Sequence, residues 1–204
     1  MKMGDLLDFD EEARKLFAAL KVGDASRAGE GPGGRYSNLD AVWEHPEHKT
    51  RIYVGNIRAA ENAGILRSHG VTRVVNCQDK SSRNFHENDP DFKYFRFPVA
   101  NWWRAKLDSD QAVLTYFGEL FAWIENELCQ GNNVMVHCLA GAHRAGTTGV
   151  ALVMHFARLD FPTALSLCKA RRPIVNPIGQ LPELLRKLER AYFNSNFYNA
   201  GEKQ

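Results

Sequence analysis

The sequence has almost no net charge and no long apolar run, and these two absences disfavour several classes of protein. Lys and Arg number 26 against 24 Asp and Glu, which gives a net charge of +2 over 204 residues. A general nucleic-acid-binding protein is disfavoured because it carries a strongly basic surface. No apolar run approaches the roughly 18 residues that span a bilayer. The segment 1–17 carries acidic residues where a signal peptide carries basic ones. We therefore expect an intracellular, cytoplasmic protein with no membrane span and no nucleic-acid partner.

Cysteine is also sparse. The four cysteines are scattered along the chain, unlike the dense pattern of a disulfide-stapled secreted scaffold. The sequence contains no Cys-x-x-Cys pair and no Cys/His zinc spacing. His45 and His48 stand close together but have no cysteine near them in the sequence. We expect no metal site and no cofactor.

The N-terminal quarter of the chain contains a predicted helix and a glycine-rich stretch. Apolar side chains at helical spacing predict a helix over 5–22. The stretch 23–38 lacks the lysine-hydroxyl ending of a nucleotide phosphate loop and follows no clear strand, so we interpret it as a flexible connector. Residues 1–48 are therefore assigned to an N-terminal extension that consists of this helix and this glycine-rich segment.

Strand and helix patterns alternate through the rest of the chain, without an internal repeat. In the first helix of this region, Asn56 is the expected cap and Gly70 the expected stop. The alternation predicts an α/β fold, in which a single domain has a central, mainly parallel sheet of four to five strands flanked by helices. The domain is expected over 49–195, and a C-terminal tail over 196–204. Strands are expected at 51–55, 71–77, 93–99 and 133–138, and helices at 56–70, 111–131, 145–157, 161–171 and 178–195.

The stretch VMVHCLAGAHRAGTTG, residues 134–149, brings a thiol, an arginine and many small residues together. Cys138 falls where a buried strand ends in a loop, and ligands bind beyond the carboxyl ends of strands in open α/β sheets. Small side chains let the loop amides converge into an anion nest. The helix that starts near Arg144 adds partial positive charge, and the planar guanidinium can grip two oxygens. We predict a phosphate site formed by Leu139, Ala140, Gly141, Ala142, His143 and Arg144.

Cys138 has a chemical role in such a site. Nearby positive charge and a helix N-terminus favour the thiolate form of cysteine. A thiolate aimed at phosphorus predicts nucleophilic catalysis through a phosphocysteine intermediate. The loop amides and Arg144 would stabilise the charge of the transition state, and no metal is required.

His137-Cys138, five further residues and Arg144 form a pattern that resembles the signature of the cysteine-dependent phosphatases. The flanks RIYVGNIRAAEN, GVTRVVNC and RRPIVNPIGQLPELLRKLE are similar to the dual-specificity branch, and the resemblance covers residues 49–192. It implies a dual-specificity phosphatase-like fold and hydrolysis of phosphotyrosine, phosphoserine and phosphothreonine in phosphoprotein substrates, with the phosphate ion as product or inhibitor. It also implies that His137 orients the loop and favours the thiolate. It does not indicate an oligomeric state.

The general acid departs from the pattern of the resembled family. The family's aspartate would fall near Asn101 or Trp102, and neither side chain can donate a proton as a carboxylic acid does. Asp108 and Asp110 are the carboxylates that remain in this loop. Asp108 is our choice, since Asp110 lies deeper in the start of the helix. Both could instead cap the helix, or the chain could lack a conventional acid.

Ala145 follows the arginine, where the family usually has serine or threonine to help the thiolate leave in the second step. Thr147 or Thr148 could take over this supporting role. The altered acid loop and Ala145 leave open a catalytically weak pseudophosphatase that only binds phosphate. The Ala-Gly in the loop is shared with glucan phosphatases, which are a further alternative.

Cys77 ends the second predicted strand, beside the predicted active site. In some relatives a cysteine there forms a reversible disulfide with the nucleophile, which would protect Cys138 from further oxidation. Cys77 could equally be a core residue. A site role and a packing or turn role also both remain open for His143, Trp102, Trp103, Asn176 and Gln180.

Overall fold

Five strands form one mixed sheet in the part of the chain that the computed structural model describes, residues 7–20 and 36–198. The strand order is β1-β2-β5-β3-β4, with β5 at the centre. Of these strands, β2, β5, β3 and β4 run parallel, and β1 at one edge runs antiparallel to β2. The predicted α/β fold with a mainly parallel sheet is confirmed. The bounds are β1 (Leu39–Glu44), β2 (Arg51–Gly55), β3 (Val71–Asn76), β4 (Lys93–Arg96) and β5 (Asn133–His137).

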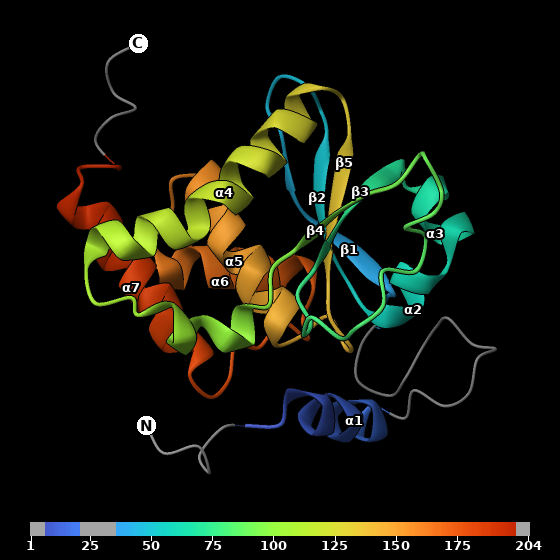
Figure 1. Ribbon diagram of the computed structural model, residues 1–204, viewed down its shortest axis with the longest axis horizontal. Coiled ribbons are helices and arrows are strands. Elements are labelled where there is room, and N and C mark those ends of the chain that lie inside the picture. The colour runs from blue at the N-terminus through green and yellow to red at the C-terminus, as the bar shows by residue number, and fades with distance from the viewer. Residues whose placement is uncertain (1–6, 21–35, 199–204) are drawn as a thin grey trace.

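Helices cover both faces of this sheet (Figure 1). They are α2 (Ile57–Glu61), α3 (Ala63–Ser68), α4 (Asp110–Cys129), α5 (Arg144–Phe156), α6 (Phe161–Arg171) and α7 (Leu181–Asn194). Successive side chains of a strand point to opposite faces, so the apolar run of β5 contributes to two cores. Val134 and Val136 join the larger core, which includes residues of α4, α5, α6 and α7. Met135 joins a smaller core on the side of α2 and α3.

The four parallel strands end at the same level of the sheet. In the strand register, His137 of β5 lies beside Gly55 of β2 and Asn76 of β3. Asn76 in turn lies beside Arg96 of β4. The loops that follow these strands therefore gather at one edge, where ligands bind in open α/β sheets. The loop after β5 begins with Cys138.

Helix α1 (Phe9–Ala19) lies outside these layers, beyond one end of the sheet (Figure 1). It begins after Asp8, whose carboxylate accepts hydrogen bonds from two amides of the first turn at 2.9 and 3.0 Å. The helix predicted over 5–22 is confirmed over the span of α1. The glycine-rich connector predicted over 23–38 lies mostly outside the described residues.

Strand β1 corrects the predicted extension 1–48. It pairs with β2 in a hairpin, from Leu39 opposite Gly55 to Glu44 opposite Arg51. This stretch is therefore an edge of the sheet and not a flexible segment. The sequence does carry a signal for it, because HPEH separates two runs that contain β-branched and aromatic residues, a pattern typical of a hairpin.

Two further elements differ from their predictions. The helix expected over 56–70 is broken at Asn62, which has an extended backbone and caps α3 by accepting an amide hydrogen bond at 3.0 Å. The strand expected over 93–99 is shortened to β4. A 3-10 helix, η1 (Val99–Ala105), follows Pro98, which has no amide hydrogen to donate to a neighbouring strand.

No single helix among the described residues has both the length and the apolar composition to cross a membrane. The pair α5 and α6 meets these two criteria together, but the two helices are bent by 119° at the break between them. Most of α5 is buried inside the fold.

Candidate active site

The loop after β5 is held by hydrogen bonds to its carbonyl groups. The Leu139 carbonyl accepts a hydrogen bond from the Ile57 amide at 3.1 Å. The Ala142 carbonyl accepts one from the Asn176 amide at 3.0 Å. Because the carbonyl and amide of a trans peptide unit point in opposite directions, outward carbonyls leave amides turned toward the inside of the loop.

Arg172, a residue that the sequence analysis does not single out, binds two more of these carbonyls. Its Nε donates to the Gly141 carbonyl at 2.9 Å, and its Nη2 donates to the Ala140 carbonyl at 3.2 Å. Its Nη1 donates to the carboxylate of Asp40 in β1 at 2.6 Å. The side chain is only 1% exposed. A buried guanidinium thus connects the loop to β1, the strand that the sequence analysis misses.

Cys138 lies at the start of this loop, directly after β5. Its side chain is buried, and the Gly141 amide donates a hydrogen bond to its Sγ at 3.3 Å. Gly141 has a left-handed backbone with φ of 67°, and a Cβ there would lie 2.5 Å from the Gly55 carbonyl oxygen. Only glycine fits this position, and its conformation turns one amide toward the sulfur.

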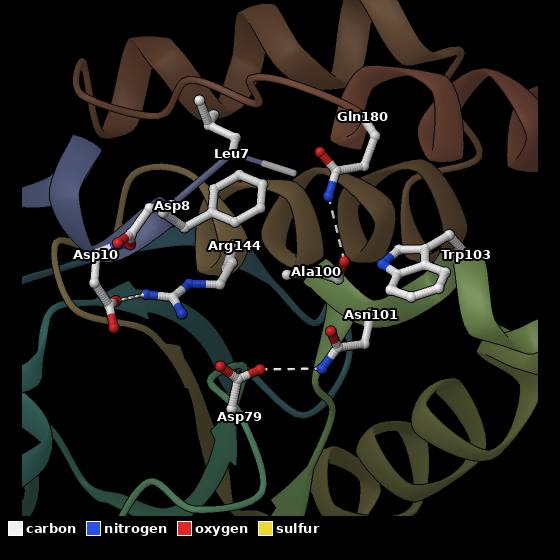
Figure 2. Close-up of a pocket in the computed structure, with 10 residues that line it drawn as sticks. Leu7, Asp8, Asp10, Asp79, Ala100, Asn101, Trp103, Arg144 and Gln180 are labelled. Carbon is white, nitrogen blue, oxygen red and sulfur yellow. Dashed lines mark hydrogen bonds and ion pairs between the residues drawn. The ribbon is translucent and has the colours of Figure 1, made fainter. Parts of the chain in front are cut away.

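Arg144 begins α5 and is 4% exposed. Its Nη2 forms an ion pair with the carboxylate of Asp10 in α1, while its Nε is buried without a partner among the described residues (Figure 2). Burial opposes the charged guanidinium, but the charges of Cys138 and Asp10 outweigh it, so the pKa of Arg144 is raised. The predicted charge is therefore in place beside the sulfur, and one edge of the guanidinium already holds an anion.

A pocket of about 180 Å³ opens beside Arg144 (Figure 2). Gln180 and Trp103 line it, which favours a site role for these two residues. Trp102 instead belongs to the larger core and is 7% exposed. The carboxylates that line the pocket are those of Asp8, Asp10 and Asp79.

The structure does not bring Asp108 to this pocket. Asp108 is exposed, and its amide donates to the Lys106 carbonyl at 2.9 Å. The cap of α4 is Ser109, and Asp110 binds side chains of α7, whose hydrogen bonds lower the pKa of that carboxyl. The 3-10 helix η1 and a left-handed turn at Lys106 separate the pocket from the start of α4, and the role of Asp108 as the acid stays a prediction.

The two histidines of the motif face inward. Burial lowers the pKa of His137 to about 4, so its ring is neutral near neutral pH and adds no positive charge beside the thiol. His143 is 6% exposed, and its Nδ1 donates to the Asn176 carbonyl at 2.7 Å. His143 therefore connects the loop to the segment before α7 and does not face the pocket. Asn176 contributes here through its backbone.

Thr147 and Cys77 also have defined partners. The Thr147 hydroxyl donates to the His143 carbonyl at 2.7 Å, which supports the loop from within α5. The Cys77 thiol donates to the Thr148 hydroxyl at 3.4 Å, and burial raises the pKa of Cys77 to about 12. Cys77 and Cys138 are both free thiols, and a disulfide between them stays a prediction.

A second group of potential ligands lies at the far end of the sheet. His45 and His48, in the turn between β1 and β2, meet Cys129 of α4, with ligand atoms within 4.8 Å of one another. Cys129 is far from both histidines in the sequence, so no local spacing indicates it. However, His45 Nδ1 accepts the amides of Glu47 and His48, both at 3.2 Å, so a neutral ring carries its proton on Nε2. His45 therefore does not present a free lone pair to a metal ion.

Comparisons with known proteins agree with this geometry. A family model described as the catalytic domain of dual specificity phosphatases matches residues 52–191. Dual specificity protein phosphatase 9 from Homo sapiens is 30% identical over 141 residues, 67% of this chain and 35% of that protein. Dual specificity protein phosphatase 1 from Arabidopsis thaliana is 30% identical over 141 residues, 69% of this chain and 66% of that protein. The chain thus spans about a third of the human relative and just under two thirds of the plant relative.

A similar fold is found among solved structures. A mouse putative dual specificity phosphatase, solved in complex with zinc tungstate, superposes with a TM-score of 0.61 at 22% sequence identity. The likeness covers 85% of this chain and 96% of that chain.

Proposed function

The chain belongs to the dual specificity phosphatase catalytic-domain family, and on that premise we propose that it hydrolyses phosphomonoesters on phosphotyrosine, phosphoserine and phosphothreonine of proteins. The observation that carries the proposal is the loop after β5. Four of its carbonyls accept hydrogen bonds from other elements, the Gly141 amide donates to Cys138 Sγ, and the loop ends at Arg144. This arrangement suits a tetrahedral dianion bound directly above a sulfur nucleophile.

In the first step the phosphoryl oxygens take hydrogen bonds from the loop amides and from the guanidinium of Arg144. The Cys138 thiolate attacks phosphorus, so an S–P bond forms and the P–O bond to the leaving group breaks. The amides and the guanidinium hold the charge of the equatorial oxygens. The leaving oxygen takes a proton from a general acid.

In the second step a water molecule attacks the phosphocysteine. A new P–O bond forms, the S–P bond breaks, and the thiolate and phosphate are released. Ala145 offers no hydroxyl to the leaving sulfur, and the Thr147 hydroxyl already donates to the His143 carbonyl. Hydrolysis of the phosphocysteine should therefore limit turnover. The leaving group should then appear in a rapid burst before the slower steady state.

The glucan phosphatase alternative is not favoured by the pocket. A wall of two tryptophans for a sugar ring would need both indoles at the surface, but Trp102 is in the core and only Trp103 lines the pocket. We also propose that the protein works in a reducing compartment such as the cytoplasm. The chemistry requires a reduced thiol, and the described cysteines are free.

The test compares the wild type with Cys138→Ser. We expect the wild type to hydrolyse an aryl phosphate and peptides that carry phosphotyrosine or phosphothreonine, and Cys138→Ser to be inactive with an unchanged melting temperature. Phosphorylated starch serves as the glucan probe. If both proteins are inert between pH 5 and 8 while the wild type binds inorganic phosphate, the chain is a phosphate-binding module and the proposal is wrong.

A further inference from the structure

The leaving group needs a proton, and the residues near the expected acid position cannot supply it. Asn101 lines the pocket beside Arg144, but an amide does not act as a carboxylic acid does. Trp102 is buried in the core. The candidates are therefore the carboxyl groups of other elements that line the pocket.

Three carboxylates line the pocket, and two of them are already engaged. Asp8 caps α1 with hydrogen bonds of 2.9 and 3.0 Å, and Asp10 forms the ion pair with Arg144. The third is Asp79, in the loop after β3. Its Oδ1 accepts a hydrogen bond of 3.0 Å from Nδ2 of Asn101 (Figure 2). Within the described part of the chain, its Oδ2 accepts no hydrogen bond and is free to act.

The backbone of Asp79 is fixed in place. Its carbonyl accepts a hydrogen bond of 2.9 Å from Nη1 of Arg96 in β4 and one of 3.0 Å from the Ser82 amide. The buried Asn76, at the end of β3, accepts the Gln78 amide with its side chain at 3.0 Å. The turn that carries Asp79 is thus held from both sides, and its carboxylate stays at the tip of η1.

Asp79 also lies at a junction between two hollows of the surface. One is the pocket that contains Arg144, and the other, shared through Asp79 and Asn101, is lined by the cations Lys80 and Arg104. The Asp79 carboxyl therefore lines both the hollow that contains the phosphate-binding guanidinium of Arg144 and the hollow next to it.

The charges around Asp79 come from several elements. Arg144 of α5 interacts electrostatically with Asp79, which is one of the charges that raise the pKa of the guanidinium against the effect of burial. Asp10 of α1, Lys80 of the same loop and Arg104 of η1 line the same two hollows.

We propose that Asp79 is the general acid of the reaction and that Asn101 is its positioning residue. This inference rests on the proposed function. As the S–P bond forms, the P–O bond breaks, and the leaving oxygen takes the proton of the Asp79 carboxyl. The carboxylate that results then accepts a proton from the water that attacks the phosphocysteine, which restores the acid.

The test is the dependence of kcat/KM on the leaving group in Asp79→Asn. Protonation by a general acid speeds the departure of a poor leaving group such as phenol, but it hardly changes the departure of dinitrophenol, which leaves readily as an anion. We therefore expect a loss of about a hundredfold or more with phenyl phosphate, a much smaller loss with dinitrophenyl phosphate, and no alkaline limb in the pH profile. The double exchange Asp79→Asn with Asn101→Asp moves the carboxyl across the same hydrogen bond and should restore part of the activity.

Asp108→Asn tests the alternative that Asp108 is the acid. Melting temperatures check that each variant is folded. An equal loss with both substrates in Asp79→Asn, or a leaving-group effect in Asp108→Asn instead, overturns the assignment of the acid alone. Absence of any Cys138-dependent turnover in the wild type overturns the proposed function, and this inference with it.

A separate observation concerns α1, which covers the loop. Cys138 is 2% exposed and Arg144 is 4% exposed, and Phe9 and Asp10 of α1 line the pocket beside Arg144. Ala13 of α1 packs against Ala140 and Ala142 of the loop. The carboxylate of Asp10 holds the guanidinium that a phosphate would bind.

We infer that α1 is an internal competitor for the phosphate site, with one oxygen of the Asp10 carboxylate in place of a phosphate oxygen. Substrate binding then requires α1 to move off the loop. The unpartnered, buried Nε of Arg144 supports this inference, because Asp10 satisfies only part of the anion-binding capacity of the guanidinium.

The test is the affinity of the full chain for inorganic phosphate, measured by calorimetry. Asp10→Asn should bind phosphate about tenfold more tightly, because a charge-assisted hydrogen bond to Arg144 is lost in the free state. Glu11→Gln is the matched control, since Glu11 is exposed and pairs with Lys15 on the surface of α1. Phosphate should also speed amide hydrogen exchange in α1 of the wild type.

Equal or weaker phosphate binding by Asp10→Asn, or unchanged exchange in α1, overturns the role of α1 alone. If neither the wild type nor the variants bind phosphate, the phosphate site of the proposed function is overturned as well.

Discussion

At the residue scale, Arg172 shows how a buried charge shapes a loop. It donates to two loop carbonyls and to Asp40. The free-energy cost of desolvating the guanidinium is therefore offset by an ion pair and by charge-assisted hydrogen bonds. Lysine would keep the charge but could not make these bonds from one planar fork.

Arg172→Lys should therefore lower the free energy of unfolding by about 2 kcal/mol and weaken phosphate binding, because the Ala140 and Gly141 carbonyls lose their donor. Denaturant titration and phosphate calorimetry measure the two effects. The exposed neighbour Arg171 offers the control Arg171→Lys, which should change neither. Unaltered phosphate affinity in Arg172→Lys would show that the loop keeps its shape without this residue.

Single residues also show what the sequence could and could not predict. The Cys138 and Arg144 pair was predictable because its spacing lies within one continuous loop. Asp10 and Asp79 were not, because their partners, Arg144 and Asn101, are 134 and 22 residues away in the chain. Such contacts depend on where α1 and the β3 loop lie in space, which local patterns do not determine.

At the element scale, the long helix α4 depends on its cap. The Ser109 hydroxyl accepts the Ala112 amide at 3.2 Å, and Asp108 makes no capping bond. In the sequence, Asp108 and Asp110 could each cap this helix, and propensity alone does not separate them from Ser109, since Asp and Ser both favour this position.

Ser109→Ala should cost about 1 kcal/mol of the free energy of unfolding, because one amide of the first turn loses its partner. Asp108→Ala should cost much less. Thermal and urea denaturation of both variants measure the difference. A larger loss in Asp108→Ala than in Ser109→Ala would contradict the observed cap.

Elements with strong patterns were predicted well, and those with weak patterns were not. The helix at 161–171 matches α6, and the predicted 145–157 matches α5 within a residue. β1 was missed because its sequence, LDAVWE, has two acids in six residues and lacks clear alternation.

At the scale of the whole molecule, buried histidines should lower the free energy of unfolding in weak acid. His155 of α5 stacks on Phe121 of α4 at 4.1 Å and shares a hydrogen bond of 2.8 Å with the Tyr192 hydroxyl of α7. Burial lowers its pKa from 6.5 to about 4, and His137 behaves in the same way. Both rings are neutral where they pack in the fold.

Above about pH 6.5 these rings are neutral in the folded and unfolded chains, so they add no pH dependence. As the pH falls from 6.5 toward 4, the unfolded chain takes up protons that the folded chain does not, and stability is lost. For His155 the loss is roughly 3 kcal/mol. His155→Gln should flatten this part of the stability curve in denaturant titrations, whereas the exposed His48→Gln should not. An equally steep curve in His155→Gln would contradict the assignment.

We propose that Cys138 forms a covalent bond to phosphorus inside the loop that Arg144 closes. The most direct measurement is a rapid acid quench of the wild type during turnover of an aryl phosphate, followed by mass spectrometry of its peptides. We expect one added phosphoryl group on the peptide that contains Cys138, and none in Cys138→Ser. A phosphoryl group on any other residue, or turnover by Cys138→Ser, would contradict it.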